Sequence, residues 1–324
     1  MLPIALDVMG ADRAPADLVQ GAVTAAKEHR IEVLLVGDPS QMGDTAGLDI
    51  LEATEVIGMH DEPGSAVRNR KDASVVRAAE AVRDGQASAM VSPGNTGAAM
   101  ASALLRMGRI SKVARPAIAT PIPVPGSTPT VLLDAGANAD CQASWLVQFA
   151  QMGAVFSRVR FGVSNPRVAL LSIGEEETKG STLVKETHKM LATHQDLNFI
   201  GNVEGRDFLR PVADVVVTDG FTGNVVLKTL EGGVGYMVET FKKLVATLPT
   251  DQGGSGIGAQ VMPLLSQLDP DTYGGAMLLG VDGVAIISHG SSKPHAITNA
   301  LVVAKDMVEA NVVAELKAAV DQPA

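Results

Sequence analysis

The sequence predicts a three-layer α/β/α protein in which helices cover both faces of a mostly parallel β-sheet. Short apolar runs alternate along the chain with longer segments that carry apolar residues at helical spacing, and this alternation is typical of such a sheet. The composition is 46% hydrophobic but only 3% aromatic, so aliphatic side chains must build the core. The 324 residues suffice for one large α/β unit, and we expect a single domain over residues 1–324.

The predicted strands are short, and turns of small or polar residues separate them from the helices. In chain order they are Pro3–Val8, Ile31–Val36, a weaker Thr54–Ile57, Ala87–Val91, Ala117–Ile122, Thr130–Asp134, Arg167–Ser172, Phe199–Gly201, Val215–Thr218 and Val281–Ile287. Helical spacing predicts helices between most of them, among which are Asp17–His29, Ser74–Asp84, Ala98–Leu105 and Thr182–Leu191. Strands and helices that alternate in this way favour parallel pairing.

The stretch from about residue 224 to residue 268 departs from this alternation. Asn224–Leu248 reads as a long helix, Thr250–Gly258 is Gly-rich and polar, and Ile257–Leu268 is apolar again. We expect a protruding helical excursion that forms the contact of a homodimer. Its apolar end faces either the dimer partner or a membrane surface, through Ile257, Val261, Met262, Leu264 and Leu265.

Composition also excludes several classes of function. The formal net charge of −10 argues against nucleic-acid binding, which needs a basic face. The single cysteine, Cys141, cannot form a disulfide within the chain, and no cluster has metal-ligand spacing, so we expect neither a metal nor a redox cofactor. There is no signal pattern, and no apolar run approaches the roughly 18 residues of a membrane span. We therefore expect a cytoplasmic protein that can also bind peripherally to the inner face of the membrane.

The segment Ser92-Pro93-Gly94-Asn95-Thr96-Gly97 lies between a predicted strand and a predicted helix. Backbone N–H groups are unsatisfied at a helix start, and they favour an anion such as phosphate. The phosphate-binding candidates are therefore Ser92, Gly94, Asn95, Thr96 and Gly97. The alternative is an ordinary turn in which Asn95 or Thr96 caps the helix.

Two motifs of other enzyme classes do not apply. Gly254-Ser255-Gly256-Ile257-Gly258-Ala259 matches a dinucleotide fingerprint, but no strand precedes it, so a nicotinamide site is rejected. The chain also lacks the G-x-S-x-G elbow of serine hydrolases.

A series of segments, in order and over nearly the whole chain, resembles the phosphate acyltransferases of bacterial phospholipid synthesis. They are Leu6-Asp7-Val8-Met9-Gly10-Ala11-Asp12, Ser92–Gly97, Arg115-Pro116-Ala117-Ile118, Leu133-Asp134-Ala135-Gly136-Ala137-Asn138, Ile173-Gly174-Glu175-Glu176, Lys179-Gly180, Gly201-Asn202-Val203-Glu204-Gly205, Thr218-Asp219-Gly220-Phe221-Thr222-Gly223-Asn224 and His289-Gly290-Ser291-Ser292. Three positions depart from the family's usual residues: Ala11 replaces a glycine, Arg13 an asparagine and Met277 a proline.

The resemblance implies a Rossmann-like, isocitrate-dehydrogenase-like sheet and a defined reaction. A long-chain fatty acyl group would pass from acyl carrier protein to inorganic phosphate, and a downstream membrane glycerol-3-phosphate acyltransferase would consume the acyl phosphate. Direct transfer needs orientation of the phosphate and stabilisation of the oxyanion, but no protein nucleophile.

Three residues are catalytic candidates, and each has a simpler interpretation. The resemblance implies that Lys185 polarises the carbonyl or binds phosphate, although helical spacing places it on a solvated face. It also implies that Asn224 donates to the oxyanion, whereas the turn before it suggests an N-cap. His289 could protonate the leaving thiolate or stabilise its turn.

Charged residues complete the prediction. Asp7, Asp12 and Asp219 lie at strand ends, where acidic groups repel phosphate, so we expect them to support loops or lysines. Four cations form a docking patch for the acidic carrier protein or, alternatively, a solvated helix end: Arg106, Arg109, Lys112 and Arg115.

Two other functions stay open. A short-chain phosphate acyltransferase that uses coenzyme A thioesters would need a small acyl cup rather than an apolar tunnel. A scaffold that binds acyl carrier protein at the membrane would explain the cations but not the Gly-rich turn.

Overall fold

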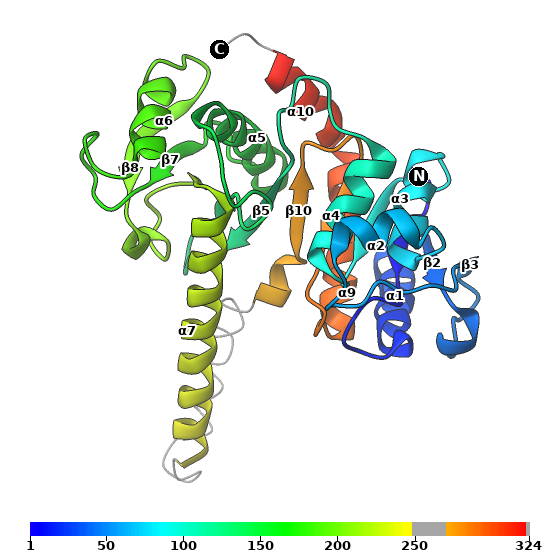
Figure 1. Cartoon of the computed structure of the whole chain (residues 1–324). Helices are drawn as coiled ribbons and strands as arrows, with labels where there is room; N and C mark the ends of the chain where they lie inside the picture. Colours follow the sequence, from blue (N-terminus) through cyan, green and yellow to red (C-terminus); the bar gives the residue numbers. More distant parts are fainter. Residues whose placement is uncertain (248–269, 322–324) are drawn as a thin grey trace.

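A continuous β-sheet runs through the centre of the molecule (Figure 1), in a computed structural model that describes residues 1–247 and 270–321. Within the described residues, this sheet has eleven strands. They are β1 (Ile4–Asp7), β2 (Val33–Gly37), β3 (Asp49–Glu52), β4 (Ala89–Ser92), β5 (Ala117–Ile122), β6 (Thr130–Leu133), β7 (Arg167–Leu171), β8 (Asn198–Val203), β9 (Val215–Val217), β10 (Ala276–Leu279) and β11 (Val284–Ile287).

The sheet consists of two parallel blocks that run in opposite directions. Its order is β3-β2-β1-β4-β11-β10-β5-β6-β9-β7-β8. In the first block, neighbouring strands pair parallel in the order β3, β2, β1, β4 and β11. In the second block, neighbouring strands pair parallel in the order β6, β9, β7 and β8. Between the blocks, β10 pairs antiparallel with β11 and β5, and β5 pairs antiparallel with β6. The sheet is mostly parallel, as predicted, and its direction reverses in the middle.

Helices cover both faces of this sheet, which confirms the three-layer prediction. One face packs against α1 (Pro15–His29), α5 (Ala143–Phe161), α6 (Thr182–Ala192), α9 (Pro294–Glu309) and α10 (Val312–Asp321). The other face packs against α2 (Pro63–Asn69), α3 (Ser74–Arg83), α4 (Thr96–Ser102) and the first turns of α7 (Gly220–Thr247). Shorter helical segments are η1 (Pro39–Gln41), η2 (Ala103–Met107), η3 (Gly205–Asp207) and η5 (Pro270–Tyr273).

Helix α7 projects away from the sheet for most of its 28 residues (Figure 1). Its outer part exposes large apolar side chains, including Tyr236 and Met237. This agrees with the first half of the expected excursion. The apolar residues predicted for its second half, Ile257 to Leu265, lie outside the described residues. Among the helices that the structure describes, none is both long and apolar enough to cross a bilayer.

One predicted strand was wrong, and one observed strand was missed. The third strand is Asp49–Glu52 and not Thr54–Ile57, where only Glu55 forms an isolated bridge, to Ala73. This strand lies at the edge of the sheet and is largely exposed. It therefore lacks the apolar pattern from which a buried strand can be predicted. Strand β10, Ala276–Leu279, was not predicted, although it joins the two blocks.

Candidate functional site

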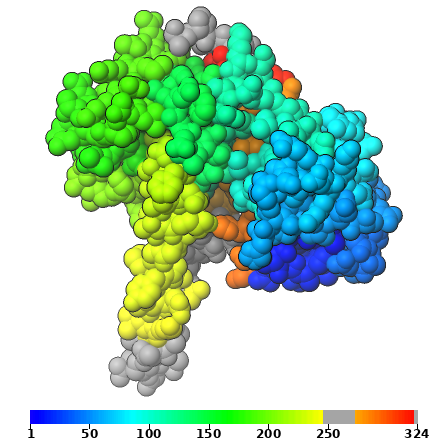
Figure 2. Space-filling model, in the orientation of Figure 1, coloured from blue at the N-terminus to red at the C-terminus, as the bar shows by residue number. Residues whose placement is uncertain are grey.

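A pocket of about 360 Å³ lies where the two blocks meet. Its floor is formed by one face of β5, with Ile118, Thr120 and Ile122, and by the start of β10. Its walls are the turns after β1, β4 and β11 on one side and α7 on the other. Figure 2 shows the hollow between α7 in yellow and the blue and cyan N-terminal residues, with orange atoms at its base.

The turns after β1, β4 and β11 are packed together to form the first wall. A Cβ on Gly10 would lie 3.2 Å from the Cα of Gly94, so these two turns touch through backbone. The Asp12 N–H donates to the Gly290 carbonyl at 3.0 Å. A Cβ on Gly290 would also lie 2.6 Å from the Asp12 carboxylate. We call this surface the cradle wall.

A buried pair, Asp7 and Ser92, lies beneath the cradle wall. The Ser92 hydroxyl donates to the Asp7 carboxylate at 2.7 Å, and both residues are fully buried. Burial raises the pKa of Asp7, although hydrogen bonds from serine side chains and from backbone N–H groups work against it. Ser92 and Asp7 therefore support the turns from below and do not line the pocket.

The predicted phosphate-binding residues divide into two groups. Gly94 and Thr96 line the pocket. Asn95 instead caps α4, because its side-chain oxygen accepts from the Ala98 N–H at 3.0 Å while its amide donates to the Gly58 carbonyl at 3.1 Å. A Cβ on Gly97 would collide with Pro63, so Gly97 allows α2 and α4 to pack closely. The capping interpretation is thus correct for Asn95.

The second wall, formed by α7, is built on the turn after β6. The buried Asp134 carboxylate accepts hydrogen bonds from the N–H groups of Ile118, Gly136, Ala137 and Asn138. A Cβ on Gly223 would collide with the Asp134 carbonyl, so the first turn of α7 can approach only because this residue is glycine.

The predicted N-cap of this helix was wrong. The cap is Asp219, whose carboxylate accepts from the N–H and the hydroxyl of Thr222, both at 2.8 Å. The helix begins at Gly220, four residues before Asn224. Asn224 is consequently a helical residue with an exposed side chain on the pocket, close to Gly136. Its amide has no hydrogen-bond partner within the described part of the chain.

Helix α7 presents two adjacent stripes to the pocket, because residues advance by about 100° each around a helix. The polar stripe consists of Asn224, Lys228 and Glu231, and the apolar stripe of Leu227, Leu230 and Val234. Leu209 and Ile122 line the same pocket and extend its apolar side. Sequence reasoning missed Lys228 and Glu231. They follow Asn224 by four and by seven residues, a spacing that places all three on one face of a helix and could have indicated them.

Three charged or titratable groups meet at the polar stripe. Glu231 Oε2 lies 2.8 Å from Lys228 Nζ, and Glu231 Oε1 lies 3.3 Å from Nε2 of His289, which follows β11. Burial acts to raise the pKa of Glu231, but the hydrogen bonds from His289 and Lys228 outweigh it, so this pKa lies below its ordinary value. His289 was predicted from the sequence and does line the pocket.

Lys185 does not join these residues. It lies exposed on α6, which packs against the opposite face of the sheet from α7. The structure therefore brings Asn224, His289, Gly94 and Thr96 together and leaves Lys185 apart.

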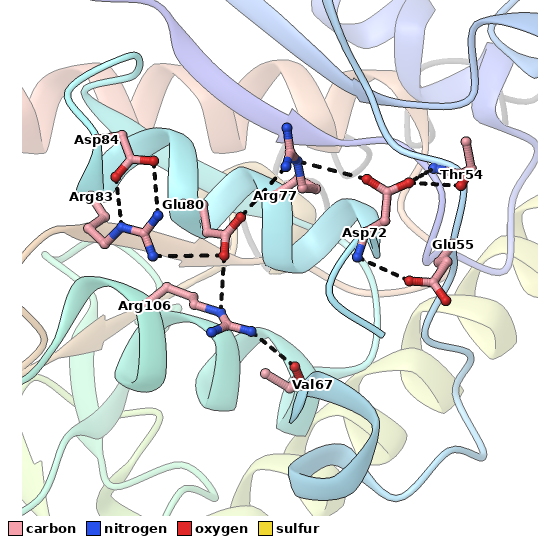
Figure 3. A network of polar contacts seen from close by, with 9 residues as sticks. All are labelled: Thr54, Glu55, Val67, Asp72, Arg77, Glu80, Arg83, Asp84 and Arg106. Atoms are coloured by element: carbon pink, nitrogen blue, oxygen red, sulfur yellow. Dashed lines mark hydrogen bonds and ion pairs between the residues drawn. The ribbon is translucent and has the colours of Figure 1, made fainter. Parts of the chain in front are cut away.

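The predicted docking cations also separate into two groups. The Arg106 guanidinium turns inward, with Nε 3.5 Å from Glu80, and takes part in the polar network of Figure 3. Arg109, Lys112 and Arg115 are exposed. Of these, Arg115 lies over the ring of Trp145 at 5.0 Å.

Comparisons with known proteins show the family of the chain and agree with its fold. A family model described as "Fatty acid synthesis protein" matches residues 2–315. A phosphate acyltransferase of Heliobacterium modesticaldum is 48% identical and covers 97% of this chain and 96% of its own length. One of Desulfitobacterium hafniense is 46% identical, with 98% and 97% covered.

Solved structures share the fold at lower identity. A branched-chain phosphotransacylase of Enterococcus faecalis superposes with a TM-score of 0.61 at 15% identity, over 95% of this chain and 99% of that one. At that identity the likeness speaks for the fold alone. The matches over nearly the full length, at close to half identity, place the chain in the phosphate acyltransferase family, an enzyme family whose substrates are phosphate and an acyl donor.

Proposed function

We propose that this enzyme transfers a long-chain fatty acyl group from acyl carrier protein to inorganic phosphate in the pocket beside α7, which yields acyl phosphate. The observation that carries the proposal is that one pocket joins an apolar side, formed by Leu227, Leu230 and Val234, to a polar stripe and the cradle wall. An acyl chain fits the first surface and a thioester with an attacking anion fits the second.

The proposed reaction needs no covalent intermediate on the protein. A phosphate oxygen attacks the thioester carbonyl carbon, and the carbonyl oxygen becomes an oxyanion. The C–S bond then breaks, the acyl–oxygen bond remains, and the leaving sulfur takes a proton to become the free thiol of the carrier. The pocket must hold two reactants in line and offer fixed donors to the oxyanion.

Each role falls on a residue that lines the pocket. The Lys228 ammonium, with the exposed hydroxyls of Thr96 and Ser291, holds the phosphate. The Asn224 amide donates to the oxyanion, since it has no partner among the described residues. His289 delivers the proton to sulfur from Nδ1, because Nε2 faces Glu231.

Lys185 stays a prediction that rests on the family resemblance alone. On α6 it lies on the other side of the sheet from Asn224.

The partners follow from the same chemistry. Acidic acyl carrier protein would dock on Arg109, Lys112 and Arg115, whose exposed charges speed the encounter of two acidic proteins. A second copy would pack along the projecting α7. The acyl phosphate would pass to a glycerol-3-phosphate acyltransferase of the membrane, which a peripheral contact would favour.

A phosphate acyltransferase with short-chain coenzyme A substrates is the second candidate. The extent of the apolar side, from Ile122 and Leu209 to Val234, favours a long chain. The scaffold hypothesis has less support, because it gives the polar stripe no role.

The test compares two lysines in the same assay. Acyl phosphate and free carrier thiol are measured with long-chain acyl carrier protein, and with short-chain and long-chain coenzyme A thioesters as competing donors. We expect the carrier-bound long chain to be preferred. Lys228→Met should lower kcat/KM at least tenfold, whereas Lys189→Met, an exposed lysine on α6, should leave it unchanged.

The kcat/KM of the Lys185→Met variant shows where the thioester carbonyl is activated. A tenfold loss in this variant with full activity of Lys228→Met would move the reaction out of the pocket beside α7. Absence of acyl phosphate with every donor would refute the proposed function itself.

A further inference from the structure

We propose that Glu231 is a positioning residue of the reaction, whose carboxylate holds Lys228 and His289 in place at the polar side of the pocket. The inference rests on the proposed function, which places the phosphate and the leaving sulfur at this side. Glu231 does not touch the reacting atoms in this account. It acts through two other side chains that do.

The geometry of the carboxylate supports this role. Its two oxygens have different partners: Oε2 accepts from Lys228 Nζ at 2.8 Å, and Oε1 lies 3.3 Å from His289 Nε2. Lys228 is one turn away on α7, but His289 belongs to the cradle wall. Glu231 therefore connects the two walls across the pocket. All three residues line the pocket.

Burial separates this ion pair from an ordinary surface pair. The Glu231 side chain is only 23% exposed, whereas Lys228 is 50% exposed and His289 is 53% exposed. The carboxylate is thus largely shielded, and its two partners reach into solvent, where a substrate can meet them. The lowered pKa of Glu231 keeps it ionised at neutral pH.

An acidic group next to a phosphate site needs an explanation, because like charges repel. Asp12 already adds one carboxylate to the same pocket. If Glu231 served binding alone, its charge would oppose the phosphate. As a positioning residue it instead restricts a lysine with four rotatable bonds and orients an imidazole, so that both donors are preorganised for the transition state.

The two effects predict that loss of the Glu231 charge lowers kcat without weakening phosphate binding, a separation of kcat from KM that a merely structural role would not produce. Glu231→Gln keeps the shape and removes the charge. The ammonium and the imidazole lose their fixed acceptor, so kcat should fall about tenfold, which corresponds to about 1.4 kcal/mol of barrier. Removal of the repelling charge should leave the KM for phosphate unchanged or lower it. Glu231→Asp, which restores the charge one methylene farther back, should recover part of kcat.

A matched control is Glu309→Gln on α9. Glu309 also pairs with a lysine of its own helix, Lys305 at 3.9 Å, but it lies on the other face of the sheet and does not line the pocket. We expect this variant to keep the wild-type kcat and KM. Its unfolding midpoint and that of Glu231→Gln check that both variants fold.

A second measurement does not depend on turnover. The imidazole signals of His289 are assigned by NMR with the help of a His289→Gln variant and then compared between wild type, Glu231→Gln and Glu309→Gln. Only Glu231→Gln should shift them.

The outcomes separate the inference from the proposed function. If the wild type forms acyl phosphate and a folded Glu231→Gln variant has wild-type kcat, the inference is wrong and the function stands. If no donor gives acyl phosphate, the function is wrong. In that case unchanged His289 signals in Glu231→Gln overturn the inference as well, and shifted signals retain Glu231 as the residue that orients His289.

Discussion

Two buried aspartates at strand ends support the two walls of the pocket in different ways. Asp7 and Asp134 are both fully buried, and burial raises the pKa of both. Asp134 accepts hydrogen bonds from four backbone N–H groups and from the Asn138 amide at 2.9 Å. Asp7 accepts from the Ser92 hydroxyl at 2.7 Å and from the Met9 N–H at 3.2 Å, and hydrogen bonds from the Ser74 side chain and the Gly10 N–H also act to lower its pKa.

The difference shows which wall depends on a particular carboxylate. Backbone donors cannot turn away, so the turn under α7 needs both Asp134 oxygens as acceptors. The cradle wall is held partly by backbone contact between Gly10 and Gly94, and the Ser92 hydroxyl can rotate to suit another acceptor. We therefore expect substitutions on the α7 side to affect stability more than those on the cradle side.

The largest effect is expected for Asp134→Ala. The substitution leaves several buried N–H groups without an acceptor, each of which carries a desolvation cost. The free energy of unfolding should fall by about 4 kcal/mol or more, measured by urea denaturation. The same change at Asp7 should cost clearly less. Equal losses for Asp7→Ala and Asp134→Ala would remove the distinction between the walls.

An intermediate effect is expected for Gly223→Ala. The new methyl group would collide with the Asp134 carbonyl, so α7 must shift, at a cost of about 3 kcal/mol. Gly94→Ala brings a methyl group 3.3 Å from Gly10 Cα and should cost about 1 kcal/mol.

Gly232→Ala is the matched control for these two variants. It adds the same methyl group to α7 at a point where, apart from the adjacent backbone of the helix itself, no atom of the described residues lies within 4 Å. It should be neutral or stabilise the protein by up to about 1 kcal/mol, because alanine favours the helix. Destabilisation of Gly232→Ala as large as that of Gly223→Ala would show that the collision is not the cause.

A pH-dependent effect on stability is expected at Asp7. Its pKa in the folded state is raised above 3.8 by burial, so the folded protein holds this proton more tightly than the unfolded chain. The protonated Asp7 carboxyl therefore contributes to the free energy of unfolding. This contribution is fully present below pH 3.8 and is lost as pH rises through the folded-state pKa, by at most about 1.4 kcal/mol per pH unit.

Asp7→Asn removes this titration. The difference in unfolding free energy between variant and wild type should therefore move in favour of the variant as pH rises from 3.5 to 7. Denaturation curves at several pH values measure it. A difference that stays constant across this range would show that the Asp7 carboxyl has the same pKa in both states.

Much of the fold could be predicted from the sequence, because buried strands and amphipathic helices carry clear patterns. Strand β5 was predicted at its observed bounds, Ala117–Ile122, and α6 ends within one residue of its predicted range. Strand β10 escaped prediction, since a four-residue strand whose partners, β5 and β11, are antiparallel to it does not fit a βα alternation.

The site was predicted in part, for a related reason. The glycines before Asn224 suggested a turn, yet Gly220 and Gly223 are helical and are needed for close approach to Asp134. The pairing of Glu231 with His289, 58 positions later, depends on which strands become neighbours. No local pattern contains that information.

The central reversal of the sheet has a consequence for synthesis of the chain. Strand β11 inserts beside β4, and α9 packs on α1, so a segment synthesised much later than β1 and β4 completes their block. Residues 130–217 hold all four strands of the other block and can pair as soon as they emerge. The edge of β4 must stay open until β11 has been synthesised.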